Sequence, residues 1–107
     1  MKKIINDERL EEVMETGELR RWVSMRMVEF DGDCEVEDRD HILNMCASLA
    51  RTRLGLQPTG GGFIQAVDDD SLVMSYAMAD NVNRKYLEVI AAFAFAYLPS
   101  KQRKDES

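Results

Sequence analysis

The sequence is poor in the residues that build metal centres and disulfide frameworks. It contains two cysteines, Cys34 and Cys46, and a single histidine, His41. The cysteines are twelve positions apart without a CxxC pair, and one histidine does not complete a zinc ligand set. We therefore expect no metal site and no cofactor. Cys46 fits a reduced thiol in the core, and His41 fits a surface or helix-capping position.

Long apolar runs are also missing. The longest candidate, Val89 to Leu98, is much shorter than the ~20 apolar residues that a membrane span needs. Polar and acidic residues soon follow the N-terminal Met1-Lys2-Lys3, so we expect no apolar segment of a signal peptide. These absences predict a cytoplasmic protein without membrane contact.

Clusters of basic residues are a third absence. The chain has 20 Asp and Glu against 14 Lys and Arg, which gives a net charge of −6 at pH 7. Apart from Lys2-Lys3 and the C-terminal tail, the basic residues form only the local groups Arg20-Arg21, Arg51/Arg53 and Arg84-Lys85. Binding to a phosphate backbone depends on clustered Lys and Arg, so direct nucleic-acid binding is not expected.

Catalytic motifs are missing as well. No Ser/His/Asp or Cys/His set is indicated. The run Thr59-Gly60-Gly61-Gly62 lacks the Lys-Ser/Thr ending of a P-loop and the GxGxxG spacing of a dinucleotide fold. We therefore expect no enzyme and no catalytic residues. The glycines fit a turn. In the alternative interpretation they hold a phosphate or nucleotide at a helix start, and the residues of that site would be Gly60, Gly61, Gly62, Arg53 and Arg84.

What is present is the composition of one globular domain. The chain has 107 residues, of which 45% are hydrophobic, enough to build a single core. We assign residues 1–99 to one helical domain. Residues 100–107 are charged and follow Pro99, and we expect them to form a disordered tail.

Apolar residues recur at the helical period over most of the chain. The pattern predicts an all-α fold, a compact bundle of four to five helices. Met25 and Val28 widen the apolar stripe of the second helix, so a strand over 22–28 stays open. The last helix is apolar nearly all round, which suits the centre of the bundle or a subunit interface. The predicted ranges are 7–15, 19–30, 40–54, 71–79 and 81–98, with a short helix of about two turns after the glycines.

Local signals place the ends of these helices. Gly17 interrupts the chain between the first two, and Gly55 fits the left-handed position after the third. We expect Asp38 or Asp40 to cap the start of the third helix. One of three consecutive aspartates, Asp68-Asp69-Asp70, is expected to cap the helix over 71–79.

The segment 29–40 is the most acidic part of the chain. Acidic residues occupy every second position from Glu29 to Glu37, so a short extended segment near 29–37 would place them all on one side. The spacing is not that of an EF-hand, because Val36 stands where that loop requires glycine. The segment fits either a solvated acidic loop or a docking surface for a basic partner. The docking residues would be Asp31, Asp33, Glu35 and Glu37.

The second half of the chain resembles a pattern in small uncharacterised phage and prophage proteins. The pattern has a proline and glycines followed by Phe-Leu-x-Ala, and then Ala-Asp-x-x-Asn before an apolar helix. Here it corresponds to Pro58 to Val67 and then to Ala79-Asp80 and Asn83, and the likeness spans 58–98. One extra residue precedes Leu72, and the first half is unmatched. The resemblance implies a helical phage accessory protein with no known reaction.

These observations lead to ranked functional hypotheses. The first is a small non-enzymatic phage accessory protein that binds a host protein in the host cytoplasm, as an inhibitor of an anti-phage defence factor. The second is the phosphate- or nucleotide-binding protein, which would sequester its ligand. The third is an acidic mimic of DNA, suggested by the net charge of −6. A homodimer through the 86–98 helix is compatible with each of them.

Overall fold

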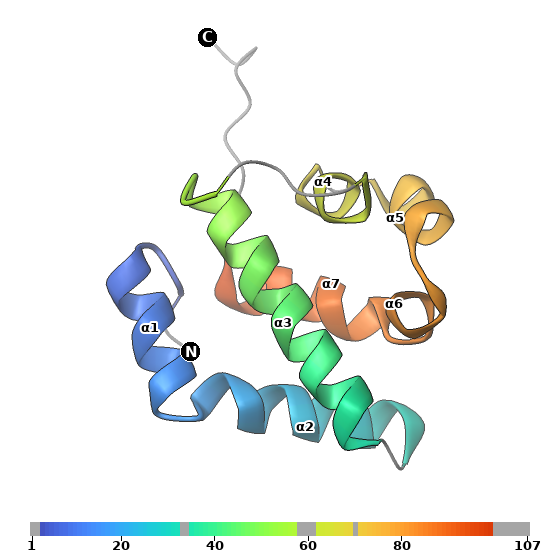
Figure 1. Ribbon diagram of the computed structural model, residues 1–107, viewed down its shortest axis with the longest axis horizontal. Coiled ribbons are helices and arrows are strands. Elements are labelled where there is room, and N and C mark those ends of the chain that lie inside the picture. The colour runs from blue at the N-terminus through green and yellow to red at the C-terminus, as the bar shows by residue number, and fades with distance from the viewer. Residues whose placement is uncertain (1–2, 33–34, 58–61, 70, 100–107) are drawn as a thin grey trace, which may run out of the picture.

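The computed structural model describes residues 3–32, 35–57, 62–69 and 71–99 (Figure 1). Within these ranges the chain forms helices and turns and no strand, which confirms the predicted all-α fold. Gly60 and Gly61, Asp33, Cys34, Asp70 and the tail 100–107 lie outside the described residues. The helices are α1 (Asp7–Glu15), α2 (Glu18–Asp31), α3 (Val36–Arg53), α4 (Gly62–Asp68), α5 (Leu72–Met78), α6 (Asn81–Lys85) and α7 (Leu87–Tyr97).

Glycines mark two helix ends, as their positions in the sequence indicate. Gly17 separates α1 from α2 with a φ of 77°, and Gly55 follows α3 with a φ of 74°. Both lie in the left-handed region, which a side chain disfavours by about 1 kcal/mol or more. At the start of α1 the Asn6 carboxamide oxygen accepts a hydrogen bond of 2.8 Å from the Arg9 backbone N–H. These local features orient α1 and α2 as a corner.

The alternative of an extended segment near 29–37 is wrong for the described residues. Helix α2 continues to Asp31, and α3 already begins at Val36. The strand over 22–28 is also wrong, because Val23 and Met27 are buried one helical turn apart. Asp38 and Asp40 are not caps: Glu35 occupies the N-cap position, and its carbonyl accepts the Arg39 N–H at 3.0 Å. The burial of apolar residues at helical spacing therefore determines the secondary structure of this region, and the alternation of charged residues does not.

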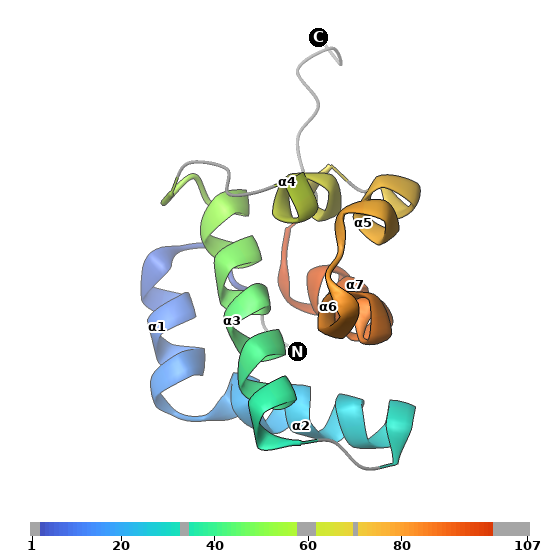
Figure 2. The same cartoon turned by 45° about the vertical axis from the view of Figure 1, so that its right-hand side comes forward.

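Helix α3 is the central element of the fold, not α7. It packs against α1, α2, α4, α6 and α7, and Figures 1 and 2 show it crossing the middle of the molecule. Cys46 lies fully buried on its inner face as a free thiol, as predicted, and burial raises the pKa of that thiol. The buried residues of this face are Ile42, Leu43, Cys46, Ala47, Leu49 and Ala50.

The predicted helix over 81–98 is divided into α6 and α7. The break is at Tyr86, whose ring is fully buried and whose carbonyl accepts the N–H groups of Val89 and Ile90. Asp80 caps the start of α6, because its carboxylate accepts the Asn83 N–H at 2.8 Å. The Asp-x-x-Asn element of the phage-like pattern is thus a helix start in this chain.

The chain ahead of α1 returns to the end of α7. The Ile4 N–H donates a hydrogen bond of 2.6 Å to the Tyr97 carbonyl, and the Ile4 side chain is fully buried. The Lys3 ammonium donates to the carbonyls of Phe95 and Leu98 at 2.8 and 3.0 Å. A cation on the free carbonyls of a helix C-terminus is favourable, so this contact stabilises the end of α7.

Candidate functional site

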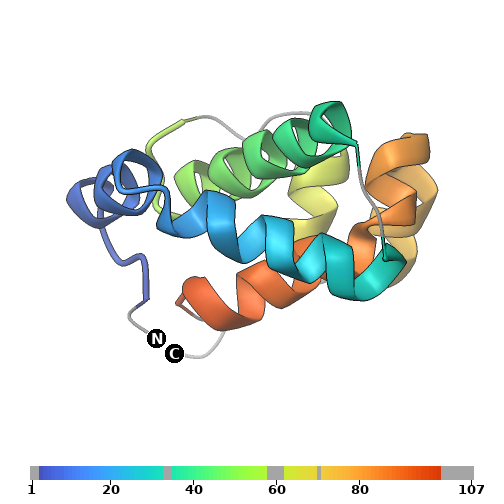
Figure 3. The same ribbon diagram turned by 90° about the horizontal axis from the view of Figure 1, so that it is seen from below.

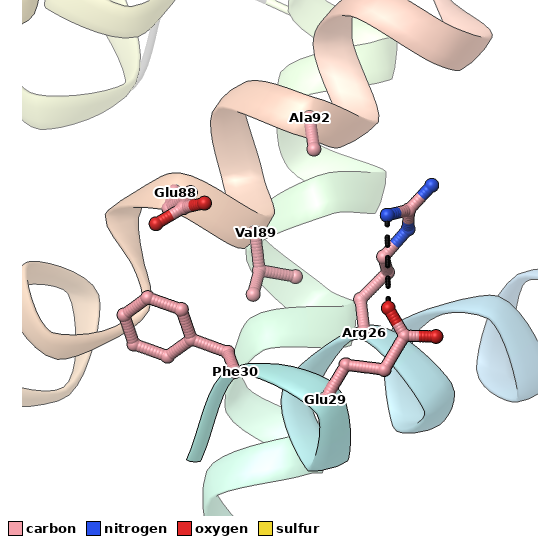
Figure 4. A pocket seen from close by; sticks show the side chains of 6 residues that line it. All are labelled: Arg26, Glu29, Phe30, Glu88, Val89 and Ala92. Carbon is pink, nitrogen blue, oxygen red and sulfur yellow. Dashed lines mark ion pairs between the residues drawn. The ribbon is translucent and has the colours of Figure 1, made fainter.

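A surface pocket of about 300 Å³ lies between α2 and α7. Figure 3 shows the two helices side by side, seen from below, and Figure 4 shows side chains of both around the hollow. Ala92 contributes only a methyl group here, which leaves the space open. The lining residues are Arg26, Glu29 and Phe30 of α2 and Glu88, Val89 and Ala92 of α7.

This pocket has an apolar floor and charged edges. Val89 is 3% exposed, and the Phe30 ring lies 6.1 Å from the buried ring of Tyr86. At one edge the Arg26 guanidinium lies 3.8 Å from the Glu29 carboxylate. Such an arrangement suits an apolar side chain whose surroundings stay polar and hydrated, as at the centre and rim of a protein interface.

The solvent face of α7 continues from the pocket. Glu88, Ala92 and Phe95 share this face, because helical residues three, four and seven positions apart lie on one side. The Phe95 side chain is 86% exposed, and Ala91 nearby is exposed too. The Lys3 ammonium lies 5.9 Å from the centroid of the Phe95 ring. A phenylalanine this exposed beside small residues forms an apolar patch of the kind found at interaction sites.

The described members of the predicted acidic docking set belong to the end of α2 and the start of α3. Asp31 is the last residue of α2, Asp33 lies outside the described residues, and Glu35 and Glu37 stand at the start of α3. Val36, between the two glutamates, is 59% exposed. In the described part of the chain Glu35 and Glu37 take part in no ion pair, and both are exposed. Carboxylates at a helix start also interact favourably with the helix dipole.

The two arginines of the phosphate-binding alternative are engaged within the chain. The Arg53 Nε donates to the Asp68 carboxylate at 2.7 Å, and both side chains are less than 10% exposed. The Arg53 guanidinium also donates to the Pro99 and Asp68 carbonyls, at 2.6 and 3.3 Å. The Arg84 guanidinium donates to the Ala79 carbonyl at 3.2 Å. Asp68 therefore pairs with Arg53 across α3 and α4.

The described glycine of this loop has a packing role. Gly62 begins α4, and a Cβ added there would lie 3.2 Å from the Met78 sulfur of α5. Ser71 performs the capping at α5, since its hydroxyl accepts the Met74 N–H at 3.4 Å. Gly62 thus permits the close contact of α4 with α5.

His41 makes a tertiary contact rather than capping a helix. Its Nε2 lies 2.9 Å from the Asn83 carboxamide oxygen and 3.7 Å from the Asp80 carboxylate. The Asn83 amide in turn donates to the Met45 sulfur at 3.6 Å, and Asn83 is buried. This polar contact joins α3 to α6, where an unpaired buried carboxamide would be costly.

A second internal network joins both ends of the chain. The Tyr97 hydroxyl donates to the Glu18 carboxylate at 3.1 Å, and the Arg9 guanidinium pairs with the same carboxylate at 3.1 Å.

Among the described residues, no three or more His, Cys, Asp or Glu side chains are grouped so as to hold a metal ion. No helix of the described ranges has the length and apolarity needed to span a membrane.

Sequence reasoning identified the apolar character of the last helix but missed the pocket beside it. The available signal was weak: Arg26 and Phe30 lie far from Ala92 in the chain, and nothing in their spacing pairs α2 with α7. No family model, curated protein or solved structure matches the chain. The likeness to phage proteins stays a prediction. The proposed function therefore rests on the exposed surfaces described above.

Proposed function

We propose that this protein is a non-enzymatic helical binder that docks on a basic surface of another protein through the start of α3. The observation that carries the proposal is the exposed Val36 between Glu35 and Glu37, which are both exposed and form no ion pair with any residue that the structure describes. Asp31 and Asp33 are the other two docking residues predicted from the sequence, and Asp33 lies outside the described residues.

The chemistry of this surface indicates what kind of partner it fits. A net charge of −6 speeds the approach of a positively charged partner and disfavours an acidic one. The exposed Val36 supplies apolar area that the two carboxylates alone do not, so contact removes both charge and apolar surface from water. A partner with Lys or Arg around a small apolar contact is complementary in both respects.

The phage-like pattern over 58–98 suggests where that partner is found. If the chain is phage-encoded, the partner is a host protein, and blocking its basic surface would inhibit it. We therefore propose a cytoplasmic inhibitor of a host factor, with anti-phage defence as the leading candidate.

Binding measured on charge-neutral variants tests the surface. We expect Glu35→Gln/Glu37→Gln to weaken binding to a basic protein captured from bacterial lysate by about tenfold, because two charge contacts are lost. The matched control is Glu11→Gln/Glu15→Gln, which removes the same charge from two exposed positions of α1. Calorimetry at low and high salt would report both affinities. Equal weakening in the two double variants would refute the assignment of this surface.

The alternative functions make different demands. Phosphate binding through Arg53 would require its guanidinium to leave a buried carboxylate at 2.7 Å. The same titration with inorganic phosphate and with duplex DNA as competitor addresses both alternatives. Binding of phosphate to the chain alone would support the ligand-binding protein, and competition by DNA for the captured protein would support mimicry of DNA charge.

A further inference from the structure

The groove between α2 and α7 carries an inference that does not depend on partner binding by α3. We propose that a second copy of this chain occupies the groove, with Phe95 of each copy seated in the pocket of the other. The pair would have twofold symmetry, with the two α7 helices antiparallel and crossing at Ala92. Both partners would then use the same surface patch, as in most dimers of identical subunits.

The register follows from the positions along α7. Phe95 lies about 4.5 Å beyond Ala92 along the helix axis, and Val89 lies about 4.5 Å before it. When two antiparallel copies cross at Ala92, Phe95 of one copy faces Val89 of the other. Val89 forms part of the pocket lining, so the highly exposed Phe95 ring meets the hollow.

The sizes of the two features agree. The pocket measures about 300 Å³, and a cavity of roughly half that volume holds a benzene molecule. The Phe30 ring and Val89 would contact the inserted ring, and Phe30 is itself 46% exposed. At the crossing, Ala91 and Ala92 have only methyl groups, which lets the helix axes approach closely.

The charged residues at the two ends of this face favour a second copy of the chain over an unrelated apolar partner. Lys3 lies beside Phe95 at one end of this face, where its hydrogen bonds to the Phe95 and Leu98 carbonyls hold it. Glu88 and Glu29 lie at the other end, around the pocket. The antiparallel arrangement brings Lys3 of each copy to Glu88 of the other, so opposite charges meet twice in one dimer.

The oligomeric state across concentration provides the first test. We expect sedimentation equilibrium of the full chain, from about 1 µM to 1 mM, to show a monomer–dimer equilibrium. Phe95→Ala is expected to weaken the dimer about tenfold or more, because its ring is the central anchor. Leu56→Ala is the matched control. Leu56 is 48% exposed and follows α3, and it does not line the groove between α2 and α7. Circular dichroism would verify that both variants fold.

Crosslinking tests the register directly. In a Cys34→Ser background, Ala92→Cys should form a disulfide-linked dimer on mild oxidation, because the two copies of that position meet on the twofold axis. Leu56→Cys in the same background should not. Glu88→Lys should weaken the dimer as well, since it would face Lys3 of the other copy. A monomer at every concentration, a dimer unaffected by Phe95→Ala, or equal crosslinking at both positions would each overturn the proposal. Loss of binding to a different protein on Phe95→Ala, with no dimer formed, would assign the groove to that protein instead.

Discussion

At the residue scale, the Tyr97 side chain joins the end of α7 to α2. Its ring lies 5.6 Å from the Trp22 ring in a T-shaped contact and 5.5 Å from the Phe93 ring in a stacked one. Its hydroxyl reaches the Glu18 carboxylate, 79 positions away in the chain. Burial chiefly, together with the bond to Glu18, raises the pKa of Tyr97 from 10.0 to about 12.

This pKa predicts how stability depends on alkaline pH. The folded state holds the phenol proton more tightly than the unfolded state, so the contribution is complete below pH 10 and is lost as pH rises toward 12. We expect the free energy of unfolding to fall more steeply over this window in the native sequence than in Tyr97→Phe. Urea denaturation at stepped pH would measure it, and the ultraviolet absorbance of tyrosinate would follow the ionisation. Parallel pH profiles for the two proteins would contradict this role of Tyr97.

At the element scale, one buried ion pair fixes how α4 attaches to α3. Arg53 lies in the last turn of α3 and Asp68 is the last residue of α4, and both are nearly covered. The bond from Arg53 to the Pro99 carbonyl extends the contact to the chain after α7. Two consecutive helices and the chain after α7 therefore meet at one guanidinium group.

Removing one member of this pair should be severe. We expect Arg53→Met to destabilise the protein by about 3–5 kcal/mol, because it removes the guanidinium that pairs with the buried Asp68 carboxylate. Arg51→Met is the matched control, since Arg51 is exposed on the same helix and should change stability by about 0.5 kcal/mol or less. Urea denaturation midpoints would give both values. A loss below about 1 kcal/mol in Arg53→Met would show that the pair does not hold α4 in place.

Element boundaries were predictable where the backbone itself decides them. Gly17 and Gly55 end helices because their left-handed φ angles suit glycine, and this preference is visible in the sequence. The alternating carboxylates of 29–37 were misleading, because alternation describes an extended chain only when a sheet supports it. In this protein Val23 and Met27 are buried on α2, and helical periodicity prevails.

At the scale of the whole molecule, the two ends of the folded chain close on each other. Ile4 lies in no helix, yet its side chain is fully buried and its N–H bonds to Tyr97. Sequence periodicity does not reveal such a residue, because it belongs to no repeating pattern. The closure joins the first described residues to the last helix.

Disturbing this closure should weaken the entire fold. We expect Ile4→Ala to cost about 2–5 kcal/mol, because a buried isoleucine leaves a cavity when it is truncated. Ile5→Ala is the neighbouring control, since Ile5 is 63% exposed and should matter little. Thermal and urea unfolding would measure the difference. If the two variants lost equal stability, the N-terminal segment would have no specific part in holding α7.

The sequence by itself determined the helical class, the glycine breaks and the buried thiol of Cys46, because helical period and backbone preference are properties of neighbouring residues. Only the tertiary structure decided which apolar side chains remain exposed. Helix α7 is apolar nearly all round, so its periodicity does not indicate which face is buried. The packing of α2 and α3 against α7 leaves Phe95 in solvent. For the same reason, the pairing of Arg53 with Asp68 and the pocket between α2 and α7 appear only once distant elements are brought together.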